Sequence, residues 1–552
     1  MRVTNNITTR QFLTNNNRLL TRQIQSENRI STQRRFNRVS EDIINGNKAM
    51  TIRRQLRDLA IYNDNLGSAK AIFNAAETNL TAIAHDNYIP VEERLTAAAN
   101  GTYSQEELDI FATELDEIAD EMVKTLNSDF SERQLFGGAS NQKTPFRIER
   151  VMIKDEAGQV VFPPDYNKYY NADGSIKQDV KLSDIPRNVT YNGIPLDFDV
   201  TNDMILPDGS VATAAGSYTV TVLDEATKKW KDGDADVRNI SAEAVARAQE
   251  EKDNSVLYPG SKPVYIDIGL GIKYNDDLTV DPQTALDVAI NGAATTGCGI
   301  DMSEVNKSKS VTTMLPDSQV QALKNGCPKN VNYTVHLTID GVGIGGGLNL
   351  GSVIPPRKDG KEYSDEEITA AFNKELKEKY ELASNKELPE GVRFVYKDSQ
   401  LTFEAGEADA QCSDCAATDT CFYFPSGEVN QDRVPLNKDG TPDLSDVYSK
   451  NLMQLVLDAA SALRKGDQAR VNAIIDRANE ANNHILNEIT TLGIKYNTIE
   501  FYQSKNKDYD YNLKERQNLV EGTDMENEII EYYAVKAAYD ATLKIGTQVL
   551  PH

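Results

Sequence analysis

The two ends of the chain share a pattern of apolar and polar positions that the middle lacks. Near the amino end, apolar residues recur in steps of three and four with no intervening proline. That spacing predicts a helix over roughly 40–85 that buries one seam against a partner helix. The seam consists of Leu59, Tyr62, Leu66, Ala69, Phe73, Ala76, Leu80 and Ile83.

The carboxyl end repeats the pattern over roughly 471–520. One column at seven-residue spacing holds the polar Asn506 and otherwise Val471, Ala478, Ile485, Leu492, Ile499, Leu513 and Val520. At about 1.5 Å per residue, a helix of about fifty residues is about 75 Å long, more than a compact domain needs. A heptad seam does not identify the chain that supplies its partner. A helical bundle within one chain and a contact between copies therefore both fit the pattern.

A further helix is predicted after each of these two amphipathic stretches. The first runs from Ser104 to Asp129. The second covers the last stretch of the chain, from Ile529 to Leu543, and carries a face of alanines that permits the close approach of another helix. The sequence thus predicts helical termini.

The middle of the chain is predicted to be rich in strands. Alternating runs such as Tyr218–Leu223 and Tyr333–Ile339 are typical of half-buried strands, and Asp-Gly and Asn-Gly pairs mark the turns. Between about 331 and 407 the order strand, strand, helix (Ser364–Ala383), strand (Val392–Tyr396), strand (Gln400–Glu404) predicts an inserted ββαββ module. The fold class is therefore α+β, with long terminal coiled-coil helices packed together and a β-rich central region.

Charge is distributed unevenly along the chain. The net charge of −25 argues against non-specific binding to nucleic acid or to anionic membranes, which need a basic surface. The first fifty residues instead hold nine Lys or Arg against three acidic residues. Their simplest use is as a basic arm beside acidic neighbours, with Arg10, Arg18, Arg22 and Arg29 as its candidate contact residues.

Targeting signals are absent from the pattern. No run approaches eighteen apolar residues, so no transmembrane helix is expected. The first residues lack the apolar core and small-residue cleavage site of a secretory signal, so an extracellular role would require export without a cleaved signal peptide.

The cysteines are all in the middle region, at Cys298, Cys327, Cys412, Cys415 and Cys421. An odd number in a long chain does not indicate a disulfide framework. Cys412, Cys415 and Cys421 are spaced closely enough for a structural zinc ion with a fourth ligand from elsewhere, such as Cys327 or Cys298. Free thiols in a loop, or one bridge formed after export, are favoured over a metal, so no metal and no cofactor is assigned.

Catalytic motifs are weak. Residues 341–346 satisfy the spacing G-x-G-x-x-G after a predicted strand, but Leu348–Val353 is predicted as another strand, whereas a dinucleotide site needs a helix there. The chain has no H-E-x-x-H sequence. We therefore expect a non-enzymatic protein without catalytic residues.

Several segments resemble one known family. The sequence Phe136-Gly137-Gly138, followed by Pro145-Phe146, is similar to the junction motif of the bacterial flagellar hook–filament junction proteins (hook-associated protein 3), members of the flagellin superfamily. The start at 1–6, the turn region 29–42, the segments 266–273 and 282–286, and the region after 521 also resemble that family. The chain departs from it at Val39, where proline is usual, and at its last residues, where the family has a Leu-Leu-Asp-Phe-Leu-like tail.

The resemblance implies a domain order. Residues 1–40 would be an amino-terminal polymerisation arm (D0-like), 41–146 and 448–520 the two halves of a helical D1-like domain, and 521–552 a carboxyl-terminal polymerisation helix. Residues 147–330 would form a β-rich D2-like outer domain, and 331–447 an inserted module with a cysteine-containing loop.

The resemblance also implies a function. The chain would be a structural subunit of the extracellular flagellum, exported by the flagellar type III route, that self-assembles into a ring between hook-associated protein 1 and flagellin. A flagellar export chaperone would be a further partner, and nucleic acid and membrane would not. Filament flagellin is the first alternative. An exported binding protein or enzyme that acts through residues 331–425 is the second.

Overall fold

The computed structural model describes most of the chain. The described residues are 2–101, 103–131, 133–140, 142–171, 173–231, 238–303, 305, 308–327, 333–344, 347–348, 350–358, 360–397, 399–406, 408–412, 427–428, 431–434, 437 and 441–549. The chain divides into two compact units. The terminal unit comprises 1–74, 265–288 and 493–552, and the central unit comprises 75–264 and 289–492.

Long helices at both ends and a strand-rich middle confirm the predicted α+β class. The helices are α1 (Arg2–Thr32), α2 (Ile43–Thr81), α3 (Tyr88–Ala99), α4 (Gln105–Leu126), α5 (Tyr166–Tyr169), α6 (Ala242–Glu251), α7 (Gly292–Thr296), α8 (Asp317–Asn325), α9 (Leu350–Val353), α10 (Asp365–Ser384), α11 (Leu452–Lys465), α12 (Gln468–Glu521) and α13 (Met525–Val549). Short 3₁₀ turns cover Leu182–Asp184 and Asn254–Leu257, and a π-helical turn covers Ala82–Asn87.

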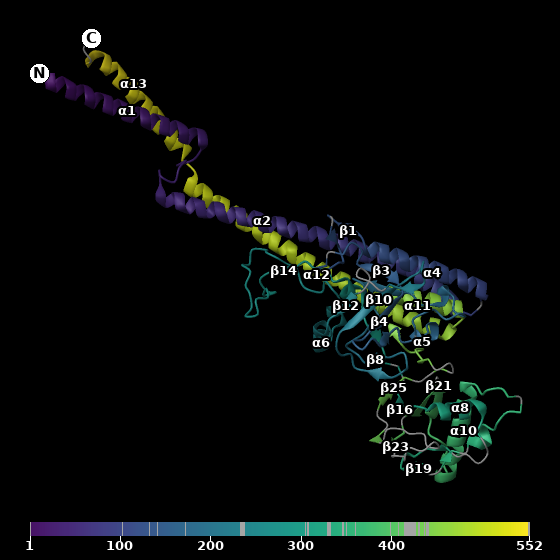
Figure 1. The fold of residues 1–552 in the computed structure, drawn as a ribbon. Coiled ribbons are helices and arrows are strands. Elements are labelled where there is room, and N and C mark those ends of the chain that lie inside the picture. Colours follow the sequence, from purple (N-terminus) through teal and green to yellow (C-terminus); the bar gives the residue numbers. More distant parts are fainter. Residues whose placement is uncertain are drawn as a thin grey trace. The chain divides into compact units, whose positions relative to one another are not determined.

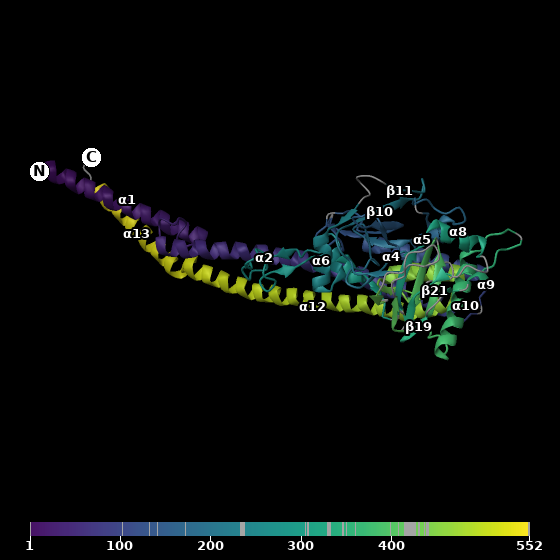
Figure 2. The same ribbon diagram turned by 60° about the horizontal axis from the view of Figure 1, so that its bottom comes forward.

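The terminal unit contains two antiparallel helix pairs, α1 beside α13 and α2 beside α12 (Figure 1). Figure 2 shows the same two pairs from another side. Within the second pair, Ile52 and Leu59 pack in one apolar cluster with Leu513, and Lys70 Nζ lies 2.8 Å from Glu500 Oε1. Residues with higher numbers on α2 face residues with lower numbers on α12, so the two helices run antiparallel.

Local sequence explains where the helices begin and change. Asp42 caps α2, since its Oδ1 accepts from the backbone N–H of Asn45 at 3.0 Å. Ser104 and Glu107 form a capping box at the start of α4. Pro90, in the first turn of α3, has no N–H to donate to the carbonyl of Asp86. Asp86 lies in the wider π-helical turn that directly precedes α3.

The central unit carries several small antiparallel sheets. A five-stranded sheet has the order β11 (Lys229–Trp230), β10 (Tyr218–Asp224), β4 (Val151–Lys154), β5 (Val160–Phe162), with β12 (Arg238–Ile240) also paired to β10. A three-stranded sheet has the order β3 (Phe146–Glu149), β6 (Asn188–Tyr191), β7 (Ile194–Pro195). Two-stranded ladders join β1 (Asp129–Phe130) to β2 (Arg133–Gln134), β8 (Met204–Ile205) to β9 (Val211–Ala212), and β15 (Ile300–Asp301) to β26 (Tyr448–Ser449).

The inserted module has its own apolar core. One sheet has the order β21 (Val392–Lys397), β22 (Gln400–Ala405), β16 (Ser308–Met314), β25 (Gln431–Arg433), and another the order β19 (Val342–Ile344), β18 (Leu337–Ile339), β23 (Ala410–Cys412), β24 (Gly427–Glu428). A further ladder pairs β17 (Tyr333–Thr334) with β20 (Gly347–Leu348). On α10, Phe372 is fully buried and its ring centroid lies 5.5 Å from that of Phe394 on β21.

The module differs from its prediction in two respects. Leu315 and Leu323 share its core, and β16 belongs to its sheet, so it begins before residue 331. The stretch 348–353 was predicted to be a strand, which is wrong, since β20 ends at Leu348 and Leu350–Val353 is the short helix α9. The run 333–339 forms two short strands rather than one, whereas Tyr218–Leu223 is confirmed as part of β10.

The dipeptide turns behave as their chemistry predicts. Asn192 and Gly193 have φ angles of +48° and +90° between β6 and β7, and Asp340 and Gly341 have +48° and +75° between β18 and β19. Two consecutive positive φ angles are typical of type I′ hairpins, and Asn-Gly and Asp-Gly pairs adopt them readily. The glycine motif at 341–346 therefore opens a hairpin; Gly345 and Gly346 lie outside the described residues.

Candidate assembly interface

The predicted seam is buried inside the chain itself. Most of the large apolar seam residues are at most 5% exposed, namely Leu59, Leu66, Phe73, Leu80, Ile83, Ile485, Leu492, Ile499 and Leu513. Tyr62 is partly buried beside the cluster of Ile52, Leu59 and Leu513. Of the two arrangements that the heptad pattern allowed, the structure therefore contains the one in which a single chain supplies both helices.

Asn506 interrupts this seam. It is 8% exposed, and its side-chain Nδ2 has no hydrogen-bond partner among the described residues. A buried polar group without a hydrogen-bond partner lowers the stability of a seam.

The basic arm lies along α13. Arg22 is 3.5 Å from Glu531 and Arg29 is 3.6 Å from Glu528 in its ion pairs. Ser26, which is buried, donates a hydrogen bond to Glu528. Half of the candidate arm residues thus pair with the chain's own last helix.

The other two arm residues, Arg10 and Arg18, are exposed, and neither forms an ion pair within the part of the chain that the structure describes. On α13, Glu526 and Asp540 are also exposed. The α1–α13 pair therefore presents cations on one helix and anions on the other.

Many apolar side chains remain exposed on the helices of the terminal unit. They include Ile7, Leu13, Leu20 and Ile24 on α1, Ile43, Ile44, Met50 and Ile61 on α2, Ile494, Phe501 and Leu519 on α12, and Ile530, Tyr533, Leu543 and Ile545 on α13. Exposed apolar residues in this number on paired helices are typical of a surface that packs against other proteins.

Both helical pairs end at one cluster around Glu521, which we call the ionic clamp. Arg53 donates to both carboxylate oxygens of Glu521, from Nε at 2.7 Å and from Nη2 at 2.6 Å, and Arg34 Nε lies 3.9 Å from Oε2. The α1–α2 turn and the α12–α13 turn are also joined by backbone hydrogen bonds. Arg35 N–H donates to the Glu521 carbonyl at 2.7 Å. Thr523 N–H donates to the Gln33 carbonyl at 3.2 Å.

Glu521 is buried but remains ionised. Burial alone would raise the pKa of its carboxyl group, but the hydrogen bonds from Arg53 and Gln517 outweigh it and hold the pKa below its usual value. The charge-assisted bidentate contact therefore ties α2 to the end of α12, and the backbone bonds of Arg35 and Thr523 join the α1–α2 turn to the α12–α13 turn.

The junction motif is a compact crossing of several segments. Phe136 is fully buried and its carbonyl accepts a hydrogen bond from Tyr191 Oη at 2.9 Å. Gly138 has a φ of +60°, and a Cβ there would lie 2.2 Å from the Gly260 carbonyl oxygen. Gly292 is equally restricted, because its Cβ would lie 2.6 Å from the Phe146 ring. Only glycine fits at these two positions.

The closely spaced cysteines include two that the structure does not describe. Cys415 and Cys421 lie outside the described residues. Burial raises the pKa of the Cys327 and Cys412 thiols to about 11, and that of Cys298 still further, so all three are neutral at pH 7. Among the described residues, no group of three or more His, Cys, Asp or Glu side chains could hold a metal ion.

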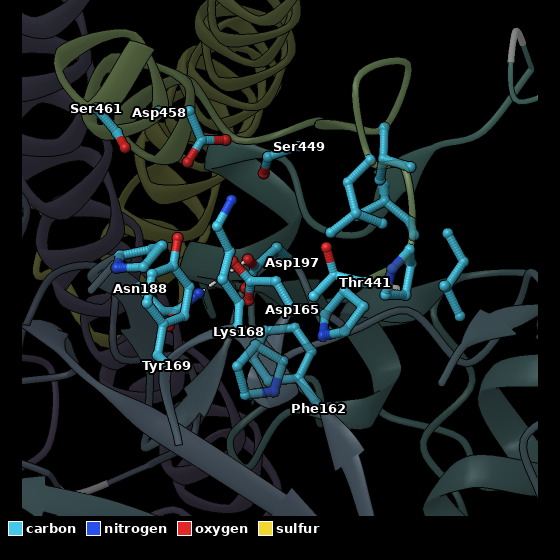
Figure 3. Close-up of a pocket in the computed structure, with 18 of the residues that line it drawn as sticks. Phe162, Asp165, Lys168, Tyr169, Asn188, Asp197, Thr441, Ser449, Asp458 and Ser461 are labelled. Atoms are coloured by element: carbon cyan, nitrogen blue, oxygen red, sulfur yellow. Dashed lines mark hydrogen bonds between the residues drawn. The ribbon is translucent and has the colours of Figure 1, made fainter. Parts of the chain in front are cut away.

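A cavity of about 470 Å³ lies in the central unit. Asp165, Asp197 and Lys168 lie together in it, and Asp458 faces them from α11 (Figure 3). Burial, together with the nearby Asp458, raises the pKa of Asp197 to about 7. Its Oδ2 accepts from Asn188 Nδ2 at 3.0 Å, whereas Oδ1 has no partner among the described residues.

The sequence did not single out this cavity or the ionic clamp. The chain has 84 Asp and Glu residues, so Asp165, Asp197 and Asp458 carry no distinguishing signal before the fold brings them together. Glu521 and Arg53 are 468 positions apart. Only the antiparallel register of α2 and α12, worked out residue by residue, could have paired them.

The described helices include none that is both long and apolar enough to cross a membrane. Residues 3–141 match the family described as the bacterial flagellin N-terminal helical region. The amino-terminal region is flagellin-like. This flagellin-like region spans α1 to α4 and the Phe136-Gly137-Gly138 sequence.

Solved structures with similarity to the chain have flagellar names. The flagellar hook-associated protein 3 of Legionella pneumophila is 10% identical with a TM-score of 0.34, and the alignment covers 85% of this chain and 98% of that one. The junction protein FlgL of Legionella pneumophila gives 10% and 0.32, covering 87% and 100%. FlgL of Xanthomonas campestris, in space group C2, gives 14% and 0.29, covering 84% and 98%.

TM-scores this low establish no common fold, so the flagellin likeness rests on residues 3–141. The comparison with curated proteins found no match.

The ionic clamp generates a first prediction. Replacing Arg53 by Met leaves the buried Glu521 carboxylate without its main partner and should reduce the free energy of local opening at the turns by about 1–3 kcal/mol. Amide hydrogen exchange of residues 515–525 in the full chain measures this change. Arg54→Met, on the next and exposed position of α2, is the matched control and should change the value by less than about 0.5 kcal/mol. Equal exchange in the two variants would contradict the role of the clamp.

The cavity generates a second prediction. A carboxyl group whose pKa is raised on folding contributes stability below its unfolded pKa of about 4, and loses it as the pH rises through the folded pKa. For Asp197 that loss extends to a pH of about 7. Asp197→Asn keeps an acceptor for Asn188 and should therefore be as stable as the wild type at pH 4 and more stable at pH 8.

Denaturant unfolding followed by Trp230 fluorescence at both pH values tests this. Asp276→Asn, at an exposed position of the terminal unit, is the control and should leave the difference between the two pH values unchanged. An Asp197→Asn variant that is less stable than wild type at pH 8 would contradict this prediction, because it would show that the fold stabilises the ionised carboxylate.

Proposed function

We propose that the chain is a non-enzymatic structural subunit of the bacterial flagellum that assembles through its paired terminal helices. The observation that carries this proposal is the flagellin family match at residues 3–141, which includes α2, one of the two helices that bury the seam. The exposed apolar residues on α1, α2, α12 and α13 support assembly, because an isolated subunit leaves them in water.

The partner of the terminal unit, in this proposal, is a second copy of the chain in a ring. Charge complementarity supports this occupant. Arg10 and Arg18 on α1 and Glu526 and Asp540 on α13 are exposed on neighbouring helices, so copies placed side by side can pair them. Such exposed pairs contribute only about 0–1 kcal/mol each, so the apolar contacts would supply most of the assembly energy.

We place the subunit at the junction between the hook, through hook-associated protein 1, and the flagellin filament. The Phe136-Gly137-Gly138 crossing supports the junction over the filament, since it resembles the motif of the junction proteins. Filament flagellin is the alternative that the family match alone also fits.

Export would use the flagellar channel with a flagellar chaperone and no cleaved signal peptide, which places the assembled protein outside the cell. The inserted module has a separate apolar core, which supports a role as a displayed domain that is not needed for assembly.

A seam variant tests the proposal. Leu66→Asp puts a charge at a position with 0% exposure, which costs several kcal/mol in a packed site, and should prevent assembly and motility while the central strands stay folded. Leu492→Asp, at a buried seam position of α12, should have the same effect. Ser68→Asp adds the same charge at an exposed position of α2 and should swim normally. Motility in cells that carry Leu66→Asp as the only copy would contradict the proposal.

A further inference from the structure

A hairpin from the middle of the sequence belongs to the terminal unit. Strands β13 (Tyr265–Ile266) and β14 (Leu286–Asp287) pair at its base, and an isolated bridge between Tyr274 and Val280 closes its tip. The hairpin projects from the α2–α12 pair (Figure 1). Nothing in the seam or the junction motif requires it.

The base of the hairpin is fixed to its own α2. Asn65 Nδ2 donates to the Asp267 carbonyl at 3.0 Å. Gly269 has a φ of +91°, and a Cβ there would lie 2.8 Å from the Tyr62 ring. The hairpin is therefore held at a defined position on the helix.

The tip displays apolar side chains to solvent. Leu278 is 83% exposed and Tyr274 is 65% exposed. Leu278 has a φ of +66°, a conformation that leucine rarely adopts. Hydrogen bonds within the turn hold it there, since Leu278 N–H donates to the Asn275 carbonyl at 3.0 Å and Asn275 N–H to the Thr279 carbonyl at 2.8 Å.

The tip is also acidic. Asp276 and Asp277 precede Leu278, and both are exposed. Thr279 donates to Asp277 Oδ1 from its hydroxyl at 2.6 Å and from its backbone N–H at 3.0 Å, and these bonds lower the pKa of Asp277. The tip thus combines two carboxylates with an exposed leucine and an exposed tyrosine.

One face of α2 has the complementary character. Met50, Arg54, Arg57 and Ile61 are spaced by four, three and four residues, which places them on one side of a helix. Met50 and Ile61 are 58% and 57% exposed. Arg54 and Arg57 are exposed between them, and neither forms an ion pair within the described part of the chain.

We propose that the hairpin tip of one copy docks on the Met50–Ile61 face of α2 in a neighbouring copy. This inference rests on the proposed self-assembly and names one of its contacts. Two carboxylates meet two guanidinium groups, and the apolar residues of the tip meet Met50 and Ile61, so charge and apolar character match together. The contact is between copies, because the tip residues are exposed within their own chain.

Photocrosslinking tests the contact directly. A photoreactive phenylalanine analogue replaces Leu278 in the full chain, expressed in the host as the only copy. Mass spectrometry should identify a crosslink to a peptide that contains residues 50–61 of a second copy. The same analogue at Leu382, which is 84% exposed on α10, should give no such crosslink. Assembly with crosslinks to another region only would overturn the inference.

A charge exchange provides the second measurement. The double variant Asp276→Lys/Asp277→Lys should reduce assembly at least tenfold, as should Arg54→Glu/Arg57→Glu. The quadruple variant should recover at least half of the wild-type level. Normal assembly of both double variants would overturn the docking contact and leave the proposed function standing. Failure of the wild-type chain to assemble would instead overturn the proposed function.

Discussion

The antiparallel apolar seam between α2 and α12 is the contact on which the rest of the terminal unit depends. It brings together helices from opposite ends of the sequence, and Leu59 and Leu513 pack in one cluster within it. Because the seam places the two ends side by side, α1 can lie along α13, and the turns that connect the pairs can meet at Glu521. The remaining apolar residues of the terminal helices stay available for neighbours.

The seam also explains why the charged contacts take the form that they do. Arg53 on α2 pairs with Glu521 at the end of α12, and Arg29 on α1 pairs with Glu528 on α13. Exposed ion pairs add little stability. The ion pair at the buried Glu521 instead ties α2 to the end of α12, next to the α12–α13 turn. The central region contributes a hairpin to this unit, and its glycine at 269 allows the close approach to Tyr62.

The sequence predicted the features that depend on local pattern. Heptad spacing located the seam residues from Leu59 to Leu513, and dipeptides such as Asn192-Gly193 located hairpin turns, because each follows from a few neighbouring residues. It missed features that depend on distant partners. The early start of the inserted module at β16, the pairing of Arg53 with Glu521 and the grouping of Asp165 with Asp197 each join segments that local periodicity does not connect. The assembly roles of the seam and of the arm residues remain proposals.

The most direct measurement is to delete the gene in its host, image the cells and assay the culture medium for flagellin. The account predicts hooks without filaments and monomeric flagellin released into the medium, because the filament would lack the subunit on which it is built. Intact filaments on the deleted strain would contradict the junction role.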